Sequence, residues 1–132
     1  MTSNVAVLGL GYVGSVTAAC LAKLGHTVVG VDRDEFKVDC ILNATSPFFE
    51  PGLEALIQDV RGAGRLTATT RTQDALADAD VVLLCVGTPS ERNGNISTEQ
   101  LRRSCLEIAE AVRDRTIACS FISVIPGKRP RS

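Results

Sequence analysis

The sequence predicts an α/β fold built on a doubly wound parallel sheet, and three observations support this prediction. An apolar run at residues 4–9 leads into the motif Gly-Leu-Gly-Tyr-Val-Gly at residues 9–14, which opens a helix. Strand-like and helix-like segments then alternate along the chain. Residues 80–86 form a continuous apolar run, which is typical of a central strand covered by helices on both faces.

The first three elements form a βαβ unit. Residues 4–9 predict a strand, and residues 13–24 place apolar side chains at helical spacing until Gly25 ends the helix. Residues 27–32 predict a second buried strand, which ends at the acidic Asp32. We therefore expect these two strands to pair in parallel.

The middle of the chain continues the alternation with shorter elements. A short helix is expected at residues 34–42. A second is expected from Pro51 to about residue 60. Proline suits the first helical turn, because the N–H that it lacks would have no partner within the helix there. Residues 66–69 predict a short strand after a glycine-rich turn, and the central strand at residues 80–86 follows.

The last elements are a helix and a strand. Ser97 and Gln100 resemble a capping box at the start of the helix. The helix has one apolar face, made of Leu101, Cys105, Ile108 and Val112. Residues 117–125 predict one more strand, and no internal repeat or linker divides the chain into separate domains.

The composition is typical of a soluble cytoplasmic domain. The chain has 132 residues, of which 45% are hydrophobic and 22% charged, and its net charge of −1 gives no reason to expect a nucleic-acid or membrane partner. The five cysteines form no C-x-x-C pair and have no metal-ligand spacing with the single histidine, so we expect reduced thiols and no metal. No apolar stretch is long enough to span a bilayer.

Three candidate binding segments fall at the carboxyl ends of predicted strands, where doubly wound sheets bind their ligands. They are residues 9–14, Asp32 with its neighbours, and the Gly-Thr-Pro segment at residues 87–89. Their convergence on one edge of the sheet predicts a shared site.

Each glycine of the first motif has a physical role in dinucleotide binding. Gly9 permits the tight turn, Gly11 lets the backbone approach a pyrophosphate, and Gly14 lets the helix pack close to the strand. The helix N-terminus then presents free N–H groups and a positive dipole to the phosphates. We therefore predict a dinucleotide site.

Two further residues of this edge have alternative interpretations. Asp32 can accept hydrogen bonds from ribose hydroxyls and repels a 2′-phosphate, which favours NAD over NADP, although the arginine at Arg33 can accommodate that phosphate. Asp32 could also be the N-cap of the helix at residues 34–42. Thr88 is either a cofactor contact or a turn residue before Pro89.

No catalytic residue is expected in this chain. His26 follows a helix end on the edge opposite the predicted site, where it would contact the helix dipole or solvent. Cys20, Cys85 and Cys105 lie on predicted apolar faces, and we interpret them as inert core thiols.

From about residue 4 to residue 127 the chain resembles the N-terminal NAD-binding domain, of Rossmann type, of the UDP-glucose/GDP-mannose dehydrogenases. The resemblance rests on residues 9–14, Gly25-His26, Ser46-Pro47, Glu50-Pro51-Gly52-Leu53 and Cys85-Val86-Gly87-Thr88-Pro89. Ser90 and the Asn-Gly pair at residues 93–94 make it most similar to the GDP-mannose 6-dehydrogenase branch. The expected domain is residues 1–127, with a basic tail at residues 128–132.

This resemblance implies a function and a set of contacts. The family uses NAD to oxidise the C6 alcohol of a nucleotide sugar to a carboxylate through cysteine-bound intermediates. At the positions that match its motifs, the resemblance implies contacts with NAD by Tyr12, Val13, Asp32, Lys37 and Thr88. Ser123 stands where the family usually has threonine, so a cofactor contact is expected there as well.

The family also has a substrate-binding and catalytic domain that this sequence does not contain. We therefore do not expect the chain to be catalytically competent alone, and a nucleotide sugar would be its partner only if that half were supplied. The alternatives are a non-catalytic dinucleotide-binding module and a truncated gene remnant. An apolar face left where the second half docks would favour self-association.

Overall fold

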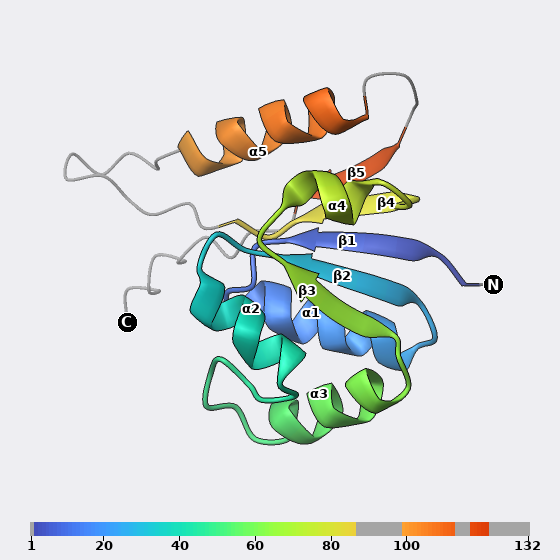
Figure 1. The fold of residues 1–132 in the computed structure, drawn as a ribbon, viewed down its shortest axis with the longest axis vertical. Coiled ribbons are helices and arrows are strands. Elements are labelled where there is room, and N and C mark those ends of the chain that lie inside the picture. Colours follow the sequence, from blue (N-terminus) through green and yellow to red (C-terminus); the bar gives the residue numbers. More distant parts are fainter. Residues whose placement is uncertain (1, 87–98, 113–116, 122–132) are drawn as a thin grey trace, which may run out of the picture.

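The computed structural model describes residues 2–86, 99–112 and 117–121. Its sheet has five parallel strands in the order β3-β2-β1-β4-β5, and the carboxyl ends of β1, β2 and β4 lie together on the left of Figure 1. The strands are β1 (Asn4–Leu8), β2 (Thr27–Val31), β3 (Leu66–Thr69), β4 (Val81–Leu84) and β5 (Ala118–Phe121). The strand order reverses at β1, which lies between β2 and β4 and pairs with both.

The predicted parallel pairing of the first two strands is confirmed. Asn4 is opposite Thr27, and the register continues to Leu8 opposite Val31. The last predicted strand begins one residue later than expected, and its positions 122–125 lie outside the described residues.

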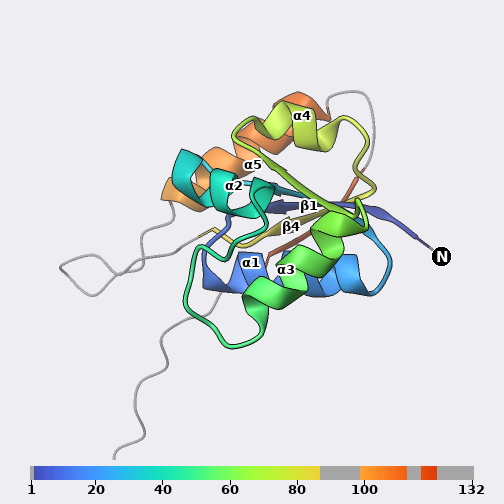
Figure 2. The ribbon, with the colours of Figure 1, turned by 60° about the horizontal axis from the view of Figure 1, so that its bottom comes forward.

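Helices cover both faces of the sheet (Figure 2). One face carries α1 (Tyr12–Lys23) and α3 (Leu53–Gly62), and the other carries α4 (Thr72–Leu76) and α5 (Glu99–Ala111). The remaining helix, α2 (Glu35–Leu42), packs into the same core as α1 and α3. This three-layer arrangement is the predicted doubly wound α/β fold.

The central strands β1 and β4 are almost entirely apolar, because helices cover both of their faces. Along β1 the side chains of Val5 and Val7 enter the core beneath α1, while Ala6 and Leu8 enter the core beneath α4 and α5. Successive side chains of a strand point to opposite faces, so a strand between two helical layers needs an unbroken apolar run.

Two helices differ from the sequence-based expectation. The helix α4 was not predicted, because its five residues are too few to show a helical period, although Ala75 and Leu76 are buried. The helix α3 begins at Leu53 and follows Gly52 in a left-handed conformation with φ of 85°, so Pro51 lies in the preceding turn rather than in the first helical turn.

Two of the cysteines expected in the core are on the surface. Cys20 and Cys105 are exposed, whereas Cys85 is buried as predicted. The helix α1 packs on the sheet through small residues such as Ala18 and Ala22, which leaves Cys20 outside the contact. On α5 only Ile108 is fully buried, so the apolar face of this helix is narrower than its sequence indicates.

Within the described ranges, none of the helices combines the length and the apolar character that a membrane span requires.

The helix α2 ends with an alanine in a conformation that favours glycine. Ala44 has φ of 59° and donates its backbone N–H to Ile41, while Thr45 donates to Cys40. The helix α1 ends with the same pair of bonds, but there Gly25 occupies the left-handed position, as predicted.

We predict that Ala44→Gly raises the free energy of unfolding by about 1 kcal/mol, because glycine has no side chain to oppose the left-handed conformation. Urea denaturation followed by circular dichroism measures the change. The matched control is Ala55→Gly at the exposed third residue of α3, which should lower the same free energy by up to about 1 kcal/mol. A loss of stability in both variants would contradict the observed end of α2.

Candidate functional site

A cleft of about 580 Å³ lies at the carboxyl ends of β1, β2 and β4. Its volume is in the range of small-molecule sites, and its position at the reversal of strand order is where doubly wound sheets bind ligands. Six of the predicted site residues line it: Gly9, Gly11, Tyr12, Val13, Asp32 and Lys37. Gly14 is buried and is not part of the cleft lining.

Two of the three motif glycines are required by the fold itself. A Cβ on Gly14 would lie 1.7 Å from the carbonyl oxygen of Gly9. Gly9 has φ of +102°, and a Cβ there would lie 2.6 Å from the carbonyl oxygen of Cys85. The turn after β1 is therefore pressed between α1 and the end of β4.

Gly11 is different, because nothing within the protein occupies the space of its missing side chain. A Cβ at Gly11 would meet no atom within 4 Å, and its φ of −67° is accessible to any residue. The free space faces the cleft, which Gly11 lines. This glycine therefore fits a ligand that approaches the backbone closely.

The N-terminus of α1 opens into this cleft without a cap. Its N-cap residue, Gly11, has no side chain, and no acidic residue lies in its first turn. The nearby hydroxyl of Ser15 donates instead to the carbonyl of Leu10, at 2.9 Å. The first N–H groups of a helix need acceptors, and the helix dipole favours negative charge there, so this end of α1 fits a phosphate group.

Asp32 fixes the turn beside this helix. One of its carboxylate oxygens accepts a hydrogen bond from the backbone N–H of Leu10 at 2.8 Å, and the other accepts from Asp34 at 2.9 Å. The N-cap of α2 is Asp34, whose side chain accepts from the N–H of Phe36, so the alternative role of Asp32 as the N-cap is wrong. Each carboxylate oxygen can accept more than one hydrogen bond, which leaves Asp32 able to bind ribose hydroxyls.

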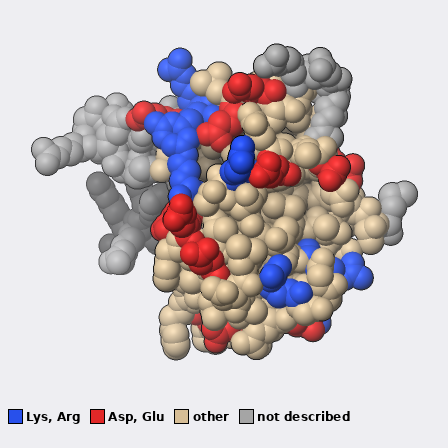
Figure 3. All heavy atoms as spheres, viewed as in Figure 1, with Lys and Arg blue, Asp and Glu red and all other residues tan. Residues whose placement is uncertain are grey.

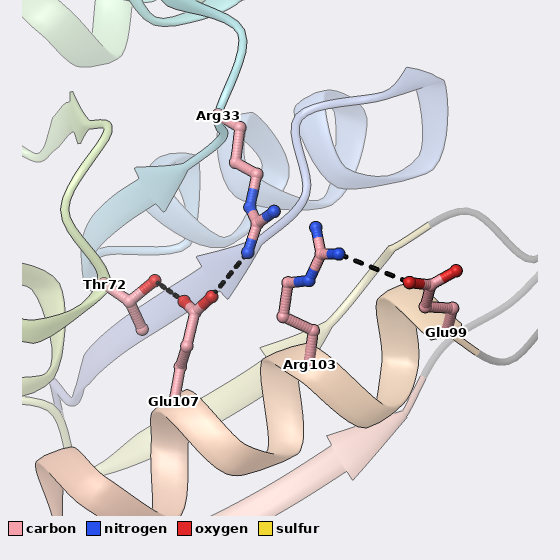
Figure 4. Close-up of polar contacts among 5 residues, drawn as sticks. All are labelled: Arg33, Thr72, Glu99, Arg103 and Glu107. Atoms are coloured by element: carbon pink, nitrogen blue, oxygen red, sulfur yellow. Dashed lines mark hydrogen bonds and ion pairs between the residues drawn. The ribbon is translucent and has the colours of Figure 1, made fainter.

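Charged residues of α5 and of the turn after β2 meet across the cleft (Figure 4). The guanidinium of Arg33 donates to Glu107 at 2.8 Å, and the hydroxyl of Thr72 donates to the other oxygen of the same carboxylate at 2.6 Å. One turn earlier on α5, Arg103 is paired with Glu99 at 3.4 Å. The contacts of Glu107 join α5 to the turn after β2 and to the start of α4 at the cleft.

The carboxyl group of Glu107 is held in its ionised form. Partial burial raises its pKa, but the hydrogen bonds from Thr72 and Arg33 and the positive charges of Arg33 and Arg103 together bring that pKa below its usual value. Figure 3 shows basic and acidic side chains interspersed on the left, the side on which the carboxyl ends of β1, β2 and β4 lie in Figure 1.

Lys37 lies at the start of α2, where it lines the cleft. Its ammonium group lies 5.8 Å from the centre of the Phe48 ring. This position is close enough for a cation–π interaction, which leaves the charge at the margin of the site.

Among the residues that the structure describes, the other polar groups near the sheet do not form a reactive centre. Burial raises the pKa of the Cys85 thiol to about 11, so it stays protonated at neutral pH and is a poor nucleophile. Nδ1 of His26 accepts a hydrogen bond from the N–H of Ser3, at the opposite ends of the strands. The described segments contain no group of three or more His, Cys, Asp or Glu residues that could hold a metal.

Two predicted contacts, Thr88 and Ser123, lie outside the described residues, as does the Ser97 of the expected capping box. Conversely, the cleft includes Thr72, Arg103 and Glu107, which the sequence did not indicate. Thr72 belongs to the unpredicted helix, and the polar face of α5 has the pattern of an ordinary solvated surface.

The fold and the cleft together define a dinucleotide-binding domain of Rossmann type. Residues 3–129 match the model of the UDP-glucose/GDP-mannose dehydrogenase family, NAD binding domain. The chain belongs to this family and corresponds to its NAD-binding domain.

Curated relatives agree with this assignment. The chain is 44% identical to a GDP-mannose 6-dehydrogenase from Pseudomonas aeruginosa, over 94% of this chain and 29% of the relative. It is 38% identical to a UDP-glucose 6-dehydrogenase from Bacillus subtilis, over 94% of this chain and 28% of the relative. The chain thus spans less than a third of the length of these relatives.

Solved structures show the same fold. A ternary complex of GDP-mannose dehydrogenase from Pseudomonas aeruginosa superposes with a TM-score of 0.89 at 43% identity, covering 92% of this chain and 28% of the other. A UDP-glucose dehydrogenase from Pyrobaculum islandicum also reaches 0.89, at 30% identity, covering 96% of this chain and 30% of the other.

We predict opposite outcomes for alanine at two of the motif glycines. Gly14→Ala should lower the free energy of unfolding by about 2 kcal/mol or more, because its methyl group overlaps the backbone of Gly9. Gly11→Ala should leave stability within about 0.5 kcal/mol, since its methyl group enters free space. Thermal and urea unfolding of both variants would measure this, and equal effects would argue against the packing described for the turn.

Proposed function

We propose that this chain supplies the NAD-binding part of a nucleotide-sugar 6-dehydrogenase, which oxidises the C6 alcohol of GDP-mannose or UDP-glucose to the uronic acid. The observation that carries the proposal is the uncapped N-terminus of α1 beside Asp32, in a cleft at the reversal of strand order. The family assignment supports it, because the matched model describes an NAD-binding domain.

In this proposal the phosphates of NAD bind at the N-terminus of α1, and the adenosine ribose binds at Asp32. The pyrophosphate lies against the N–H groups of Tyr12 and Val13, and the absence of a side chain on Gly11 permits its approach. Asp32 accepts hydrogen bonds from the adenosine ribose. Lys37 adds a positive charge at the margin of the cleft.

Two contacts of the proposal rest on matching motifs alone. Thr88 and Ser123 carry hydroxyl groups at positions where the family contacts NAD. Bound NAD supplies the hydride acceptor for oxidation of the alcohol. The residues of this chain hold and orient the cofactor, and none of them is assigned a catalytic role.

GDP-mannose is the nucleotide sugar that we favour. Its 6-dehydrogenases include the relative at 44% identity, against 38% and 39% for two UDP-glucose 6-dehydrogenases. We place the protein in the cytoplasm, because its five cysteines are unpaired thiols and thiols stay reduced there.

We predict that Asp32→Ala weakens NAD binding by at least about tenfold, the effect of losing one charge-assisted hydrogen bond or more to the ribose. Isothermal titration calorimetry of the 132-residue chain with NAD measures the dissociation constant. The matched control is Asp39→Ala, which removes the same charge from an exposed position of α2 outside the cleft.

Circular dichroism would establish that both variants remain folded. Equal NAD affinity for the parent chain and Asp32→Ala would contradict the assignment of Asp32. A folded parent chain without saturable NAD binding would contradict the proposed function as a whole.

A further inference from the structure

Arg33 is paired with the acidic Glu107 at the end of β2, where a dinucleotide-binding fold distinguishes NAD from NADP. It directly follows Asp32 at the end of β2, and its guanidinium donates to Glu107 at 2.8 Å (Figure 4). In a dinucleotide fold, the 2′-position of the adenosine ribose lies at the end of this strand. An arginine there can bind the 2′-phosphate of NADP, provided that its guanidinium is free.

Both oxygens of the Glu107 carboxylate are used in the cleft. One accepts from Arg33 and the other from the hydroxyl of Thr72 at 2.6 Å, so the carboxylate is held from two sides. A carboxylate in this position occupies the donor groups of Arg33 and also repels a phosphate. Asp32 adds a second negative charge to the lining of the same cleft.

We propose that Glu107 is a specificity-determining residue, which withholds Arg33 from the 2′-phosphate of NADP and thereby favours NAD. The inference rests on the proposed NAD-binding function. It assigns the choice between the two cofactors to a contact between residues 74 positions apart, in addition to the carboxylate of Asp32.

A role in stability alone does not account for this contact. The side chains of Arg33 and Glu107 are 62% and 36% exposed, and exposed ion pairs contribute little to folding. Removing Glu107 should therefore leave the fold intact. It would leave Arg33 without its acidic partner, in a cleft that Arg103 also lines.

The test is calorimetric titration of the 132-residue chain with NAD and with NADP, for the parent and for Glu107→Ala. We expect Glu107→Ala to tighten NADP binding by about tenfold or more, the effect of one charge-assisted hydrogen bond to the phosphate. NAD binding should change much less than NADP binding, since NAD has no 2′-phosphate for the released Arg33 to bind.

Two matched variants make the test specific. Glu110→Ala removes the same charge from the same helix outside the cleft, and it should not produce the gain in NADP affinity. Arg33→Ala combined with Glu107→Ala should abolish the gain, because the released guanidinium is absent. If Glu107→Ala fails to fold, Glu107→Gln keeps the shape of the side chain and should give a smaller gain of the same sign.

Three outcomes would overturn the inference while NAD binding by the parent upholds the proposed function. They are an unchanged NADP affinity in the Glu107 variant, an equal gain in Glu110→Ala, and a gain that persists in the double variant. A parent chain that binds neither nucleotide would overturn the proposed function and the inference together.

Discussion

The site depends on the close approach of α1 to the turn after β1. The carbonyl of Gly9 lies where a side chain on Gly14 would be, so the helix begins directly behind the turn. This contact fixes the direction of α1 and brings its first N–H groups to the end of the central strand. Asp32 then holds the same turn from the side, through the N–H of Leu10. The packing of a few backbone atoms thus positions the candidate phosphate site and the candidate ribose site together.

The end of the cleft at the N-terminus of α1 and the rest of its lining differ in charge. The phosphate end relies on backbone N–H groups and the dipole of α1, with no acidic residue in its first turn. The lining of the cleft also carries the carboxylates of Asp32 and Glu107, and Glu107 is paired with both Arg33 and Thr72. A dinucleotide with a negatively charged centre and neutral ribose hydroxyls fits this division. A second phosphate on the ribose would meet these carboxylates, which is why we assign cofactor choice to these residues.

The sequence predicted the features that depend on local pattern. Buried strands have continuous apolar runs, and the turn at residues 9–14 needs Gly9 and Gly14 for its packing, so the central βαβ unit was predictable. The helix α4 was missed because five residues show no period. The exposure of Cys20 and the ion pair of Arg33 with Glu107 arise from tertiary packing, which no local pattern reports.

A crystal structure of the chain with NAD would show whether the cofactor lies at the N-terminus of α1. We predict the pyrophosphate against the first turn of α1 and a ribose hydroxyl within hydrogen-bonding distance of Asp32, with Arg33 still paired to Glu107. NAD bound elsewhere on the protein, or a pyrophosphate away from the N–H groups of Tyr12 and Val13, would contradict it.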